Sequence, residues 1–134
     1  MSGGFGVPWL VLCGAFAIHV ADEALTDFLS VYNTTARAIR ARFPFLLIPT
    51  FTFRVWLTGL VVVVLVLASL TPIAFRGAAG LRPVAYVFGL VMAGNGVLHL
   101  VASLYKRRAM PGVYSAPLIL AAAIYLLVSA ARPS

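Results

Sequence analysis

Four long apolar segments constrain this chain more than any other feature of its sequence. Each is close to the roughly 20 residues that a helix needs to cross the hydrocarbon core of a bilayer. Backbone groups cannot stay unpaired in lipid, so these segments are expected to be helices. The expected fold class is all-α: an integral membrane four-helix bundle, formed by a single transmembrane domain over residues 1–134. The expected spans cover residues 7–32, 50–75, 83–105 and 113–131.

The composition excludes a soluble globular domain. Hydrophobic residues make up 63% of the chain and charged residues 10%, whereas soluble domains average roughly 45–50% and about 25%. A domain of 134 residues buries only about two-thirds of its surface on folding, which leaves too much apolar surface exposed to water. Lipid is therefore the expected solvent.

Basic residues gather in two of the expected connections. Three arginines fall within residues 33–43, and Lys106 with two arginines falls within residues 106–112. Cytoplasmic loops carry an excess of Lys and Arg, so these two loops are expected in the cytoplasm and both termini outside. The expected location is the cell (inner) membrane, as a multi-pass protein. Pro44 and Pro49 bracket a short apolar stretch, which predicts an interfacial or re-entrant segment between the first two helices.

The net charge of +7 combines ten basic residues with only three acidic ones. The basic loops are short and lack interleaved aromatic residues, and anionic lipid headgroups account for them. Membrane lipids are therefore expected partners, and no nucleic acid is expected.

All three acidic residues lie within the first apolar segment, between Asp22 and Asp27. At 100° per residue, a helix over residues 7–32 places its polar residues in one arc of roughly 140°. Such a stripe should face the bundle interior or a partner, because lipid does not tolerate it. Asp27, near the expected helix end, is equally well explained as a solvated residue. The stripe contains seven polar residues, of which the last lies just beyond the span: His19, Asp22, Glu23, Thr26, Asp27, Ser30 and Asn33.

Asp22 and Glu23 require a neutralising partner. Two adjacent carboxylates in a low-dielectric bundle should not both ionise unpaired. Each charge at mid-helix costs roughly 2.5–3.5 kcal/mol on insertion scales. Arg54 is the one basic residue expected within a span, and a single arginine cannot balance both acids. Protons or a bound cation must neutralise the remainder.

The third expected span supplies further polar residues. Asn95, His99 and Ser103 share one helix face at i, i+4 spacing. The first and third spans run in the same direction, so His99 and Glu23 should lie at similar depth. The candidate catalytic residues are His19, Asp22, Glu23, Asn95 and His99.

Two imidazoles and two carboxylates form a donor set suited to Zn²⁺, Fe²⁺ or Mn²⁺. The candidate metal ligands are His19, Glu23, His99 and Asp22, with Asp22 either a direct ligand or a residue that orients one. The same set suits acid–base chemistry without a metal. A further alternative is that these side chains only form interhelical hydrogen bonds.

Three short motifs resemble those of the HXXEE domain family of prokaryotic multi-span membrane proteins. His19-Val20-Ala21-Asp22-Glu23 resembles the family signature, with Asp22 in place of its first Glu. Asn95 and His99 match an NxxxH motif, and residues 109–112 match a YxPG motif in part. Ala109 stands where that motif has Tyr. The resemblance covers almost the whole chain and implies a helical membrane protein with enzyme-like polar motifs.

These features predict a small membrane-embedded enzyme. The expected chemistry is metal-dependent or acid–base hydrolysis or isomerisation of a lipidic or amphipathic small molecule. The alternative is a proton-coupled small-molecule transporter, similar to the small multidrug resistance exporters and acting as a homodimer. A structural or regulatory membrane subunit is a third reading.

Overall fold

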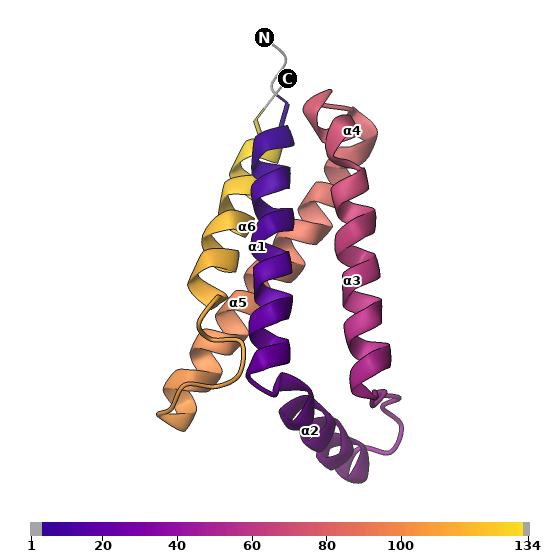
Figure 1. Ribbon diagram of the computed structural model, residues 1–134, viewed down its shortest axis with the longest axis vertical. Helices are drawn as coiled ribbons and strands as arrows, with labels where there is room; N and C mark the ends of the chain where they lie inside the picture. Colours follow the sequence, from indigo (N-terminus) through magenta and orange to yellow (C-terminus); the bar gives the residue numbers. More distant parts are fainter. Residues whose placement is uncertain (1–3, 133–134) are drawn as a thin grey trace.

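The computed structural model describes residues 4–132, and the regular structure within this range is entirely helical (Figure 1). The predicted all-α class is therefore confirmed. In chain order the elements are α1 (Gly6–Leu25), α2 (Phe28–Arg42), α3 (Phe53–Ser69), α4 (Thr71–Phe75), the short 3₁₀ helix η1 (Ala79–Leu81), α5 (Arg82–Lys106) and α6 (Ala116–Ala130).

Three helical segments are long and apolar enough to cross a membrane. They are α1, the α3–α4 segment over Phe53–Phe75, and the η1–α5 segment over Ala79–Lys106. The remaining apolar helix, α6, has 15 residues. The fold is thus that of a helical membrane protein, with three clear candidate spans rather than the four of comparable length that the sequence predicts.

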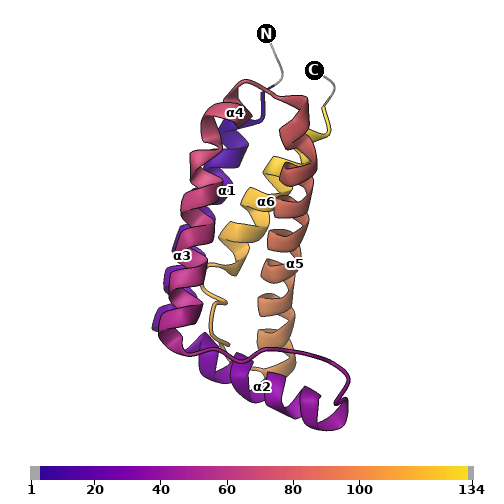
Figure 2. The same cartoon turned by 90° about the vertical axis from the view of Figure 1, so that its right-hand side faces the viewer.

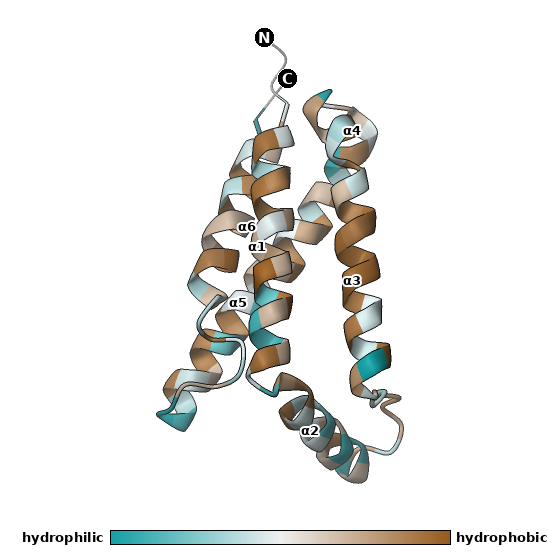
Figure 3. Cartoon of the chain, in the orientation of Figure 1, coloured by the Kyte–Doolittle hydropathy of each residue, from teal (hydrophilic) through white to brown (hydrophobic). Residues whose placement is uncertain are grey.

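The helices form a closely packed group with one helix set apart. Helix α6 packs against both α5 and α1, whereas α3 packs on α1. Figures 1 and 2 show α3 standing beside this group, and none of its residues is buried. The Trp9 indole N–H donates to the carbonyl of Leu67 at 2.9 Å, which fixes the upper part of α3 to α1. Figure 3 shows α3 hydrophobic along most of its length.

Small residues allow α5 and α6 to approach closely. A Cβ added at Gly96 would lie 3.1 Å from both the Ala116 carbonyl oxygen and the Leu120 Cβ. One added at Gly89 would lie 2.7 Å from the Leu127 side chain. Close backbone approach at small residues is the usual way in which membrane helices pack. Because His99 lies one turn beyond Gly96, this contact also places it against the start of α6.

The first helix is shorter than the sequence predicts. It ends at Leu25, and Asp27 adopts a left-handed conformation (φ 60°) that Asp tolerates better than most residues. The Thr26 hydroxyl donates to the Asp22 carbonyl at 2.6 Å and accepts the backbone N–H of Gly112 at 3.1 Å. The prediction of one helix over residues 7–32 is wrong, because this contact with a distant loop ends it.

A second helix, α2, follows the break and lies at an angle to α1 (Figure 2). It carries Ser30 and Asn33, so the predicted seven-residue stripe is divided between two helices. The Asn33 amide pairs with both backbone groups of Phe51, at 2.8 and 3.0 Å, and holds the 43–52 connection against α2. The stretch between Pro44 and Pro49 is non-helical and mostly exposed, with the Phe45 side chain 77% accessible.

We expect Gly96→Leu to destabilise the protein by about 1–3 kcal/mol, because the new side chain overpacks the α5–α6 contact. Thermal unfolding in detergent would measure the loss. The matched control is Gly94→Leu, since a Cβ at Gly94 meets nothing within 4 Å. Equal stability of the two variants would contradict this account of the helix contact.

Candidate functional site

Two histidines converge on one carboxylate in the interior of the helix group. His19 and Glu23 lie one turn apart on α1, and His99 approaches from α5. The Glu23 Oε1 atom is 3.0 Å from His99 Nε2 and 3.3 Å from His19 Nε2. All three side chains are buried, and the imidazole centroids are 4.8 Å apart. The structure therefore brings residues 76 positions apart in the sequence into one cluster.

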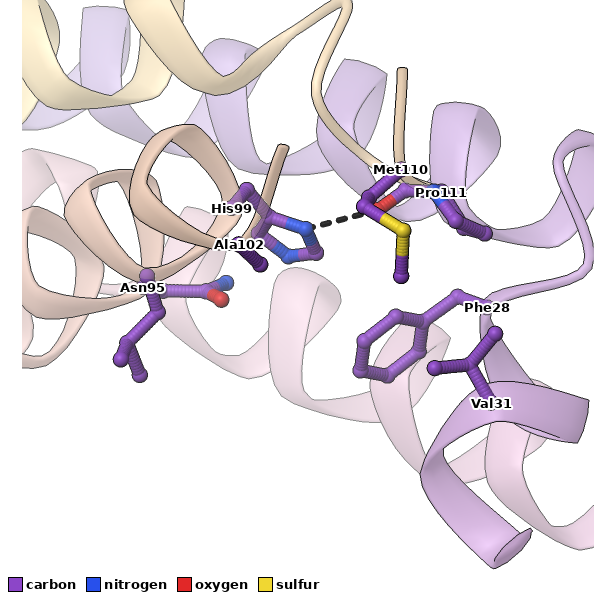
Figure 4. Close-up of a pocket in the computed structure, with 8 residues that line it drawn as sticks. Phe28, Val31, Asn95, His99, Ala102, Met110 and Pro111 are labelled. Atoms are coloured by element: carbon purple, nitrogen blue, oxygen red, sulfur yellow. Dashed lines mark hydrogen bonds between the residues drawn. The ribbon is translucent and has the colours of Figure 1, made fainter. Parts of the chain in front are cut away.

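A backbone carbonyl fixes the orientation of the His99 ring. His99 Nδ1 lies 2.7 Å from the carbonyl oxygen of Pro111 (Figure 4). A carbonyl oxygen can only accept a hydrogen bond, so Nδ1 carries the proton and donates. The Nε2 atom is then the one that faces Glu23. An imidazole held in this way by its far nitrogen is the arrangement that metal-binding histidines use.

A hydroxyl and a second carboxylate fix the His19 ring. Ser115 Oγ donates to Asp22 Oδ2 at 2.7 Å, since an ionised carboxylate can only accept. The same hydroxyl oxygen lies 2.6 Å from His19 Nδ1 and therefore accepts its N–H. His19 Nε2, like that of His99, is then the ring nitrogen that faces Glu23. The two Nε2 atoms thus point at one carboxylate oxygen for independent reasons.

Asp22 does not join the central cluster. Its Oδ2 atom accepts the backbone N–H of Ser115 at 2.8 Å as well as the hydroxyl. Ser115 is the N-cap residue of α6, where a negative charge is stabilised by the exposed N–H groups and the helix dipole. Asp22 therefore joins α1 to the start of α6 and orients His19 through Ser115. This placement matches the orienting role rather than that of a direct ligand.

Asn95 completes the group. Its amide nitrogen lies 3.1 Å from His19 Nε2, which accepts the N–H of the amide. Figure 4 shows Asn95 and His99 on the same face of α5, with Phe28 and Val31 of α2 across a cavity from them. All five candidate residues thus lie in or beside one site.

The loop of residues 107–115 closes the cluster, and Gly112 makes this possible. Gly112 has φ +83°, and a Cβ added there would lie 2.5–3.0 Å from three atoms of the His99 ring. Its N–H donates to the Thr26 hydroxyl. Only glycine fits a position that combines a left-handed backbone with this close approach. Ala109, where the motif has Tyr, is exposed.

Gly112 and Ser115 contribute contacts to the site but are not among the candidate residues named from the sequence. The partial motif at residues 109–112 indicated the first, whereas no local pattern indicated Ser115 as the partner of both His19 and Asp22. Two charged residues lie outside the site. Asp27 is exposed and accepts from Ser30 Oγ at 2.8 Å, and Arg54 is exposed near the start of α3.

Within residues 4–132 Glu23 has no Lys or Arg partner, and its ion pairs are with the two histidines. The Asn95 amide donates a hydrogen to His19 Nε2. The Nδ1 protons of His19 and His99 are donated to the Ser115 hydroxyl and the Pro111 carbonyl. One proton shared between Glu23 and His99 satisfies the remaining atoms. A cation in place of that proton would satisfy them equally.

Two cavities reach the cluster. One, of about 240 Å³, is bordered by Asn95 and His99 and lies between α5, α2 and the 107–115 loop (Figure 4). The other, of about 290 Å³, is bordered by Glu23 and Asn95 and lies on the side of α3. Phe28 lines both cavities. A small molecule can therefore approach the buried groups from either side of Phe28.

The fold and the site together define a helical membrane protein with a buried histidine–carboxylate cluster. Over residues 9–126 the chain matches the family described as "Protein of unknown function with HXXEE motif". It belongs to this family, and the resemblance seen in the sequence is confirmed. No curated protein and no solved structure matches the chain.

Gly112→Ala should destabilise the protein by about 1–3 kcal/mol, because the substitution strains a left-handed backbone and displaces the His99 ring. Thermal unfolding in detergent checks the stability, and ¹⁵N NMR of the imidazoles checks the Nδ1–H of His99. Gly80→Ala is the control, since a Cβ there meets nothing within 4 Å. An unchanged His99 signal in Gly112→Ala would contradict the proposed contact.

Proposed function

We propose that this protein is a membrane-embedded enzyme in which His19, Glu23 and His99 bind a divalent metal ion. The observation that carries the proposal is the convergence of two Nε2 atoms on one carboxylate, each ring being fixed at Nδ1 by a separate partner. One donor atom from each of the three residues lies within 4.8 Å of the other two. A tetrahedral ion with bonds of about 2.0–2.1 Å holds neighbouring donors roughly 3.3 Å apart, and the two Nε2 atoms already lie 3.0 and 3.3 Å from Glu23 Oε1.

The donor set is of a catalytic kind. Two histidines and one glutamate leave a coordination position open, as in catalytic rather than structural zinc sites. The cavities beside Asn95 and Glu23 give that position access to a substrate. Zn²⁺, Fe²⁺ and Mn²⁺ all suit these ligands. Such an ion supplies Lewis-acid chemistry for hydrolysis or isomerisation of a lipidic or amphipathic substrate.

The protein's own residues would divide the remaining work. Ser115 and Pro111 hold the histidine rings in place. Asp22 accepts the hydrogen of the Ser115 hydroxyl, so that the hydroxyl oxygen can accept the N–H of His19. Asn95 presents an amide beside the cluster that suits a developing negative charge. Ser115 Oγ donates to Asp22 and accepts the N–H of His19, so a covalent intermediate on this hydroxyl is not part of the proposal.

The proposed topology is that of a four-helix bundle in the cell membrane, with α6 as a shorter fourth crossing. Lys106 ends α5, two arginines follow it in the 107–115 loop, and three lie in α2. Figure 1 shows α2 and this end of α5 at the same end of the molecule. The excess of basic residues there favours a cytoplasmic position for that end. Both termini would then lie outside.

The protein purified in detergent and incubated with Zn²⁺, Fe²⁺ or Mn²⁺ is expected to retain about one ion per chain, because three fixed protein ligands make one site. Elemental analysis after gel filtration measures this. The His19→Ala, Glu23→Gln double variant should retain none. Asp27→Asn removes an exposed acid of the same segment and should bind like the wild type. No retained ion in the wild type would refute the metal site.

Metal binding should weaken as the pH falls, because the ion must displace the proton shared by Glu23 and His99. For one displaced proton the dissociation constant rises by up to about tenfold per pH unit. Isothermal titration in buffers of different ionisation enthalpy measures the number of protons released, expected to be about one per ion. A dissociation constant that does not change between about pH 7.5 and 6 would show that no proton is displaced.

The second candidate function is proton-coupled transport of a small molecule by a dimer. It is favoured by the two cavities that meet at Asn95 and Phe28, and by a buried carboxylate able to hold a proton. An obligate dimer without retained metal, whose Glu23→Gln variant loses uptake into proteoliposomes, would favour transport over catalysis.

A further inference from the structure

One face of α5 lines a continuous series of cavities from one end of the helix to the other. The cavity beside Glu23 shares Phe16 and Met92 with a third cavity, of about 210 Å³, that lies between α3 and α5. It also shares Asn95 and Phe28 with the cavity beside His99. The α5 residues that border the three cavities begin at Val84 and end at Ala102. At 1.5 Å per residue this face is about 27 Å long.

The three adjoining cavities form a groove that is apolar at one end, whereas Glu23, Asn95 and His99 border its other two cavities. Every residue that borders the third cavity is apolar, including Val63 and Leu67 on α3 and Val91 on α5. The only ionisable acid that borders the middle cavity is Glu23, beside the Asn95 amide. The apolar part, from Val84 to Asn95, spans roughly 16 Å along α5. This distribution complements a molecule with a long apolar chain and a polar end.

The groove also lies where hydrocarbon surrounds the protein. Both of its walls belong to segments apolar and long enough to cross a membrane. None of the residues of α3 is buried, and Val87 and Val91 on the facing side of α5 are 62% and 56% exposed. Figure 2 shows α3 and α5 side by side, with α6 between and behind them. An acyl chain can therefore enter sideways without leaving the apolar layer.

We infer that this groove between α3 and α5 binds the hydrocarbon chain of a lipid and directs its polar end to Glu23 and Asn95. The inference rests on the proposed function in one respect, since it takes the histidine–carboxylate cluster as the reacting end of the groove. The inferred substrate class is an amphiphile that places one long hydrocarbon chain in the groove. The chain exchanges contacts with lipid tails for contacts with the groove walls, so long chains that reach along the apolar part should bind and short ones should not.

The test uses palmitate that carries a photoreactive diazirine in its chain, with the full-length protein in nanodiscs. Labelling is expected at residues of α3 and of the Val84–Met92 part of α5. It should saturate near one lipid per chain and be competed by unlabelled palmitate but not by butyrate. Uniform, uncompeted labelling of all lipid-facing surfaces would overturn the inference.

Matched variants locate the binding. Val91→Trp fills the groove and should reduce competable labelling by about tenfold, because the indole occupies the space that the chain would take. Val97→Trp is the control, since Val97 is an exposed valine of the same helix that borders none of the three cavities. Val87→Trp replaces Val91→Trp if the latter does not give a monodisperse helical protein. Unchanged labelling in the groove variant would overturn the inference.

Metal analysis separates this inference from the proposed function. Val91→Trp lies outside the cluster and should retain the same metal content as the wild type. The His19→Ala, Glu23→Gln double variant should still be labelled, because the apolar walls of the groove are intact. Labelling without any metal in the wild type would support the lipid groove and refute the metal site. Retained metal without competable labelling would support the metal site and refute the lipid groove.

Discussion

The burial of Glu23, with no Lys or Arg partner in the described part of the chain, is the constraint on which the rest of the site depends. A carboxylate in this position requires hydrogen-bonding or cationic groups around it, and two histidines from different helices meet that requirement. Each histidine in turn needs a partner for Nδ1, which recruits Pro111 and Ser115 from the loop before α6. One buried charge thus determines the packing of α1, α5 and the start of α6.

Much of this arrangement could be predicted from local properties of the sequence. The hydropathy of the segments predicts membrane helices, and the i, i+4 spacing of His19 and Glu23 places both on one helix face. The common direction of the first and third spans predicts that His99 lies at a similar depth. The recurrence of three motifs in one order indicates the family. These inferences need no knowledge of how the helices pack.

The missed features depend on contacts between distant residues. The polar residues continue in helical phase through Asp27, and no Gly or Pro marks the end of α1, so the sequence predicts a longer helix. That helix ends where Thr26 meets Gly112, 86 residues later. Nothing in the sequence distinguishes Ser115 from other serines near a helix start. Its contact with Asp22 arises because α1 packs beside the start of α6. The position of α3 beside α1, which leaves the lateral groove, likewise follows from packing alone.

The helix break after Leu25 separates α1, which carries His19 and Glu23, from α2 and α3, which border the cavities. The groups in contact with Glu23, and those that orient them, come from α1, α5 and the 107–115 loop, whereas α2 and α3 supply only walls. In the proposed enzyme, substitutions in these walls would change which molecules reach the cluster, while the hydrogen bonds that orient its side chains stay intact. Selectivity and reactivity would then be separable along the sequence.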